Sequence, residues 1–169
     1  MSRVDVEQVD VFEALVLYLR RALGLNDRQC YETLDPYSPT IPKGGDYWVT
    51  VAPGEGQYDV EHQIGGGEDQ LTEESVVTVT AYTRIKLDST DHDENLLRDA
   101  RRGVFVLKHK ILKALVGADI PKGSDTFLRQ LLYARHAHAP QILEGSKDNR
   151  LRLACISIDF GVDFDWDLT

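Results

Sequence analysis

The stretch that decides the fold is RLACISIDFGVDFDWDLT, residues 152–169, in which apolar and mostly polar side chains alternate. The first set is Ala154, Ile156, Ile158, Phe160, Val162, Phe164, Trp166 and Leu168, and the second is Cys155, Ser157, Asp159, Gly161, Asp163, Asp165 and Asp167. Period two places the sets on opposite faces of a β-strand. At about 3.3 Å per residue the strand would be roughly 45–50 Å long, and most strands have only about 3–10 residues. We therefore expect it to bend around a barrel-like core or to extend beyond its own domain.

The composition is that of an acidic globular chain. Its 169 residues are enough for one domain, 1–169, with a proper core. Lys and Arg number 19 against 28 Asp and Glu, for a net charge of −9. Proteins that bind DNA by sequence usually carry a basic patch. The charge balance therefore argues against sequence-specific DNA binding.

The cysteines and the N-terminus indicate the compartment. Cys30 and Cys155 are far apart and form no CxxC pair, which favours two buried free thiols over a disulfide. The first residues lack an apolar signal core, and no apolar run approaches the about 20 residues of a membrane span. We expect a protein made in the cytoplasm, without a membrane partner.

Periodicity predicts the remaining elements. Apolar residues at helical spacing predict helices over 10–26 and 89–117, with a proline- and glycine-rich connector over 35–46. The second helix would bury Leu97, Ala100, Val104, Leu107, Ile111 and Leu115. Strands are expected over 47–52, 57–64, 75–88 and the end of 126–143, with a flexible hairpin loop near 53–75 and a turn over 144–149. The fold class is α+β, an antiparallel sheet of mixed strand lengths packed against two main helices, with a long C-terminal strand.

Two short motifs invite catalytic or metal hypotheses. The glycines of GGGEDQ, residues 65–70, lack the Gly-Lys-Ser/Thr of a phosphate loop, so we interpret them as a hairpin tip. His136 and His138 would point the same way from a strand, as metal ligands can. A third ligand could come from Asp91, His92 or Asp93, although surface or interface histidines remain the alternative.

The aspartates of the C-terminal strand could serve as an acid–base pair or a calcium site. Catalytic carboxylates usually occupy pockets that separate their pKa values, and calcium loops contain turns. An unbroken alternation gives neither, so the aspartates are interpreted as a solvated or electrostatic surface. With no serine elbow or HExxH motif, we expect no enzyme and no cofactor.

The order of elements resembles the tail terminator proteins of long-tailed bacteriophages, also called tail completion or head-tail joining proteins, over residues 8–168. The stretches that carry the resemblance are the amphipathic N-terminal helix, PTIPKGGDYWVTV (39–51), SVVTVTAYTR (75–84), NLLRDARRGVFVLKHKILKAL (95–115) and LACISIDFGVDFDWDL (153–168). The resemblance implies a virion protein of the phage neck, made in the host cytoplasm. It implies a hexameric ring that caps the tail tube, ends its polymerisation and joins the head connector while DNA passes through.

Within such a ring we expect two functional surfaces. The first is a subunit interface formed by Arg101, Arg102, Phe164, Trp166 and Leu168. The second is an acidic lumen or surface, which DNA would not stick to, formed by Glu68, Asp69, Glu73, Glu74, Asp159, Asp163 and Asp165. The alternatives are another head-tail connector of similar fold, a small metal-dependent hydrolase using His136 and His138, and a monomeric adaptor that binds through Gly65–Gly67.

Overall fold

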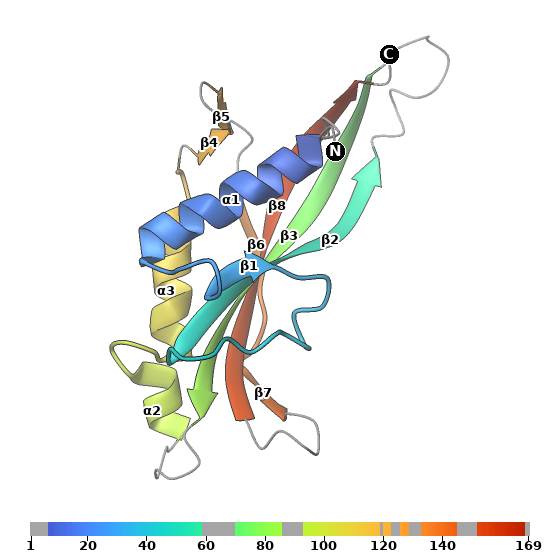
Figure 1. The fold of residues 1–169 in the computed structure, drawn as a ribbon. Helices are drawn as coiled ribbons and strands as arrows, with labels where there is room; N and C mark the ends of the chain where they lie inside the picture. The colour runs from blue at the N-terminus through green and yellow to red at the C-terminus, as the bar shows by residue number, and fades with distance from the viewer. Residues whose placement is uncertain are drawn as a thin grey trace.

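The protein is described from a computed structural model, which covers residues 7–58, 70–85, 93–118, 120–122, 126–128, 133–144 and 152–167 (Figure 1). The elements are α1 (Glu7–Leu23), β1 (Cys30–Glu32), β2 (Tyr47–Tyr58), β3 (Gln70–Ile85), α2 (Asp93–Arg98), α3 (Val104–Leu115), β4 (Ile120–Lys122), β5 (Thr126–Leu128), β6 (Tyr133–Ala137), β7 (Gln141–Glu144) and β8 (Arg152–Asp167). The α+β class is confirmed. None of the described helices is both long and apolar enough to cross a membrane.

The main sheet has the strand order β1-β2-β3-β8-β6, and β7 also pairs with β8. All of these pairs are antiparallel except β1 with β2, which are parallel, with Cys30 opposite Val49. The expected antiparallel pairing is found for the other pairs, and the short parallel edge strand β1 was not predicted. The physical reason is that the short turn after α1 brings the chain back beside β2 before the 35–46 connector.

The two longer helices, α1 and α3, cover one face of the sheet (Figure 1). The core lies between these helices and the sheet. α1 and α3 contribute apolar stripes, and every second residue of β2, β3 and β8 points toward them. From β8 the core takes Ala154, Ile156, Ile158, Phe160 and Val162. The apolar face predicted from the alternation is therefore confirmed as far as Val162.

A smaller apolar cluster lies on the opposite face. Trp48 and Tyr82 stack there with ring centroids 5.3 Å apart, beside Leu153 and Cys155. The 35–46 connector covers this cluster, because Ile41 packs against it. Both cysteines are buried and free, as predicted. This half of the outer face is thus closed, whereas the described residues leave the other half open.

The helix predicted over 89–117 is broken into α2 and α3. Between them the Asp99 carboxylate accepts hydrogen bonds from the backbone N–H groups of Arg101 and Arg102, both at 2.9 Å. Both N–H groups lower the pKa of the Asp99 carboxyl, and the N–H of Arg102 has the larger effect. Gly103 then has an extended backbone, with φ −60° and ψ 136°, and a Cβ there would lie 2.6 Å from the Asp99 nitrogen.

The break changes which side chains are buried before α3. Leu96 is buried and Leu97 only partly, whereas Ala100, predicted for the core, is exposed. Within α3 the predicted stripe is confirmed, since Val104, Leu107, Ile111 and Leu115 are all buried. The prediction of one continuous helix was therefore wrong only around Asp99, where the turn interrupts the helix.

The hairpin after the connector also differs from the prediction. β2 runs without interruption from Tyr47 to Tyr58, with an irregularity in register between Pro53 and Gly56. β3 begins at Gln70, so both ends of the predicted loop over 53–75 are strand. The rest of that loop, and most of the strand predicted over 57–64, lies outside the described residues. Within 126–143 the chain forms three short strands, of which β5 pairs only with β4.

The long C-terminal strand is matched within its own chain. β8 pairs with β3 over its full length, from Arg152 opposite Ile85 to Asp167 opposite Gln70. Figure 1 shows the two strands continuing together beyond the start of α1. The strand therefore does not close a barrel. With β3 it forms the two long central strands of the sheet, which we call the β3–β8 ribbon, and β2, β6 and β7 flank this ribbon along most of its length.

Candidate interaction face of the sheet

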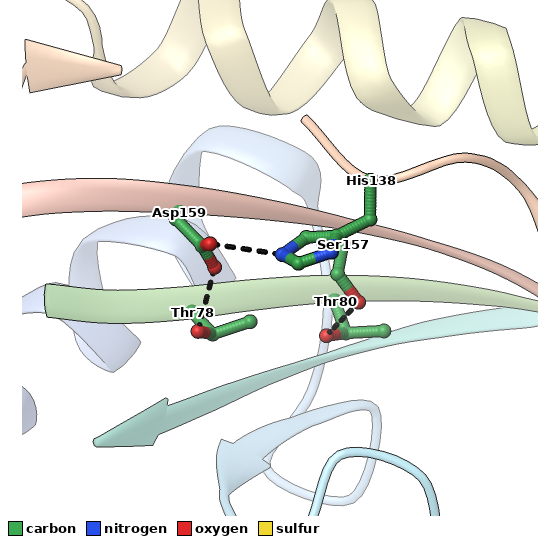
Figure 2. A network of polar contacts seen from close by, with 5 residues as sticks. All are labelled: Thr78, Thr80, His138, Ser157 and Asp159. Atoms are coloured by element: carbon green, nitrogen blue, oxygen red, sulfur yellow. Dashed lines mark hydrogen bonds and ion pairs between the residues drawn. The ribbon is translucent and has the colours of Figure 1, made fainter. Parts of the chain in front are cut away.

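The open half of the outer face holds a network of polar side chains that joins three strands (Figure 2). His138, just after β6, places Nε2 2.8 Å from Oδ2 of Asp159 on β8. The other oxygen of that carboxylate accepts a hydrogen bond of 2.8 Å from the Thr78 hydroxyl on β3. Asp159 is half-buried and holds both neighbours, so its carboxylate ties β6 to β3 through β8.

A second pair continues the network along the same strands. The hydroxyls of Thr80 and Ser157 lie 2.8 Å apart and are both buried. The backbone N–H of His138 donates to the Ser157 carbonyl oxygen at 2.9 Å. Buried polar groups that satisfy one another in this way fix strand register. We interpret this part of the face as structural.

Farther along β8, a tyrosine covers the gap in the aspartate ladder. The Tyr133 ring lies over Gly161, where a Cβ would be only 2.3 Å from the ring carbon Cζ. Its hydroxyl donates to Oε1 of Glu74 at 2.8 Å, and the Arg135 guanidinium lies 3.2 Å from the same oxygen. The hydrogen bond to Glu74 raises the pKa of Tyr133, and the charges of Glu74 and Asp163 add to this effect.

A groove of about 270 Å³ opens beside this tyrosine. It is lined by Glu55, Gln57, Glu74, Val76, Arg135, His136 and Asp159. Three carboxylates in the lining face one guanidinium, and exposed Asp163 lies directly opposite Glu74 in the register. The face is therefore rich in negative charge, with Arg135 offsetting part of it. We call Glu55, Glu74, Asp159 and Asp163 the acidic face.

The predicted acidic residues do not share one surface. Glu74 and Asp163 are exposed on the acidic face, but Glu73 is only 8% exposed and belongs to the other face of β3. Asp159 is engaged by His138 and Thr78, as above. For Asp165 only the register is described, opposite Thr72. Glu68 and Asp69 lie outside the described residues.

The two predicted histidines do come together. Their ring centroids are 4.8 Å apart and the rings meet edge to face. His138 is bonded to Asp159, and the structure contains no group of three or more metal-ligating side chains within its described ranges. Of the suggested third ligands, Asp91 and His92 lie outside those ranges, and only the backbone of Asp93 is described.

The two predicted interface arginines are separated. Arg101 is exposed, whereas Arg102 is only 8% exposed and donates from Nη1 to the Arg84 carbonyl oxygen at 2.8 Å. Arg102 thus joins the end of β3 to the start of α3 inside one chain. Phe164 and Trp166 are opposite Glu73 and Leu71 in the β3–β8 register. Leu168 lies outside the described residues.

Sequence reasoning missed Glu55, Tyr133 and Arg135. Glu55 comes from a part of β2 that was expected to be loop. Tyr133 had one available signal, because a glycine inside a strand often marks the close approach of another group, and Gly161 interrupts the aspartates. Arg135 had none, since its pairing with Glu74 depends on the position of β6.

No family model and no curated protein matches the sequence. Among solved structures, the chain is similar to one in a structure described as the virion of a native gene transfer agent (GTA) particle, with 17% identity and a TM-score of 0.41. The match covers 95% of this chain and 100% of the other. A similarity at this level establishes no shared family.

Proposed function

We propose that the protein is a structural component of a phage virion, a tail terminator that forms a ring at the neck. The proposal rests on the resemblance of its elements, in chain order, to that family. The observation that carries it is the β3–β8 ribbon, which continues past the helical layer at one end of the molecule (Figure 1). No enzymatic step is part of the proposal.

The far half of the ribbon is the proposed subunit boundary. Beyond Gly161, β8 pairs only with β3 among the strands that the structure describes, since β6 and β7 lie along its earlier residues. A strand edge of this kind readily pairs or packs with another chain. Phe164 and Trp166 follow Val162 in the apolar series, and aromatic residues are enriched in the cores of interfaces. We therefore place them, with Leu168, at or near the contact between subunits.

The excess of acidic residues suits a channel for DNA. A net charge of −9 on each subunit would repel phosphates and let a duplex slide without binding.

Electron microscopy of the purified, untagged protein mixed with phage tail tubes tests the function. Rings that bind one end of the tubes and stop their growth are the expected result. Rings that bind isolated head connectors but never tubes would assign the protein to another position in the neck. Particles without a ring, which neither bind nor shorten tubes, would contradict the proposal.

The C-terminal strand is tested with Trp166→Ala. We expect weaker ring formation with unchanged thermal unfolding, because the change would remove an interface side chain and not a core one. Tyr37→Ala, at a half-exposed tyrosine of the connector, is the matched control and should assemble normally. Undiminished assembly of Trp166→Ala would remove this strand end from the interface.

A further inference from the structure

The solvent face of α3 combines an aromatic side chain with positive charge. Phe105, His109 and Lys113 are all exposed and follow one another at four-residue spacing, so they form a single stripe, which we call the α3 stripe. Phe105 is 46% exposed, so nearly half of this large apolar residue is open to solvent. The sequence of α3 contains three lysines and no acidic residue. This helix is thus a local basic surface on an acidic chain.

The charges of this surface are partly used within the chain and partly available. Lys110 donates to the Arg101 carbonyl oxygen at 3.4 Å and lies 5.8 Å from the centre of the Tyr47 ring. Lys113 makes no hydrogen bond or ion pair within the part of the chain that the structure describes. An exposed ammonium about 12 Å along the helix from an exposed aromatic ring suits an apolar interface anchor with a charged rim.

The acidic face is complementary in charge to the α3 stripe, but within one chain the two surfaces cannot touch. The acidic face includes the exposed carboxylates of Glu55, Glu74 and Asp163, beside the groove of about 270 Å³. α3 packs on the other face of the same sheet, through Leu107 and Ile111. One layer of sheet therefore separates the two charged surfaces, and they can meet only between two copies.

We propose that the α3 stripe of one copy binds the acidic face of a second copy. The inference rests on the proposed ring and adds the two surfaces that would build it. A contact between two different patches is heterologous, so each copy keeps one patch free for the next, and the series can close into a ring. Phe105 supplies the apolar contact near the groove, and Lys113 supplies the charge that pairs with the carboxylates.

Charge reversal tests the contact. Lys113→Glu and Asp163→Lys should each weaken assembly about tenfold or more, as measured by sedimentation over a concentration series. The double variant, with both reversals in one chain, should regain most of the affinity because the charges are again opposite across each contact. Lys43→Glu and Asp27→Lys are the matched controls, at exposed residues outside both surfaces, and should assemble like the wild type.

Thermal unfolding of each variant excludes a loss of fold, and Phe105→Ala provides a second variant that changes no charge. Phe105→Ala should also weaken assembly about tenfold. Wild-type rings that persist equally in Lys113→Glu, Asp163→Lys and Phe105→Ala would overturn the inference and leave the proposed ring intact. A wild-type protein that never self-associates would overturn both this inference and the proposed ring. If Lys113→Glu forms normal rings that no longer bind tubes, the α3 stripe binds a different protein and not a second copy, which would also overturn the inference.

Discussion

The ring of Tyr133 occupies the space that a side chain at residue 161 would need, and Gly161 is the residue that leaves this space open. The relationship explains why the aspartate ladder is interrupted between Asp159 and Asp163. It also positions the Tyr133 hydroxyl to donate to Glu74, so that β6 is bonded to β3 across β8.

Gly161→Ala should therefore displace the exposed Tyr133 ring and cost about 1 kcal/mol, the usual contribution of the hydrogen bond that is lost. Because Tyr133 would lose its hydrogen bond to Glu74, which is the main cause of its raised pKa, its phenol should titrate at lower pH in the variant. Thermal unfolding and ultraviolet titration measure the two effects. When Gly161→Ala is made in the Tyr133→Ala background, it should reduce the free energy of unfolding much less. An equal reduction in both backgrounds would show that the Tyr133 ring does not fill the site.

Asp159→Asn should cost about 1–3 kcal/mol of folding free energy, because the half-buried carboxylate holds both His138 and Thr78. Chemical denaturation measures it. Asp163→Asn is the matched control on the same strand face, and as an exposed change it should stay within about 0.5 kcal/mol of the wild type. Equal stabilities of the two variants would contradict a structural role for Asp159.

Gly103→Ala should strongly destabilise the junction of α2 and α3, by about 1–3 kcal/mol, since the new Cβ would meet backbone atoms of Asp99 and Leu97 that cannot move independently. Ala100→Ser, at an exposed neighbour in the same turn, should be nearly neutral. Denaturant unfolding compares the two. A stabilising effect of Gly103→Ala would show that the helix prefers to be continuous.

The two cysteines should resist thiol reagents at neutral pH until the protein unfolds. Burial raises the pKa of Cys30 to about 12 and that of Cys155 to about 11, so both stay protonated in the folded state. The unfolded chain ionises its thiols at lower pH. Their contribution to stability is therefore complete at neutral pH and is lost as the pH rises through the folded-state pKa values. Rapid labelling of the native protein near neutral pH would contradict this burial.

The sequence predicts best those parts of the fold that repeat. The β8 core face, from Ala154 to Val162, follows from period two because each residue meets the same apolar layer. The break before α3 was missed because the Asp99 turn fits inside a helical period and depends on two local backbone hydrogen bonds. The parallel pairing of β1 was missed because three residues carry too little periodicity.

The candidate site was predicted only in part, because its contacts join residues that are far apart in the sequence. The pairing of Asp159 with His138 joins residues on separate strands, so their registers must be known before the contact can be inferred. Glu73 and Glu74 appear equivalent in the sequence, but the alternation of β3 puts one in a buried position and the other on the acidic face. The charge of a segment therefore predicts a surface only after the face of each residue is known.

The central claim is that the chain assembles with itself, and the native mass of the purified, untagged protein over a concentration series tests it most directly. We predict a closed species at six times the chain mass of 19.0 kDa, or a monomer that converts to it as concentration rises. A monomer at every concentration, with the fold intact, would contradict the claim.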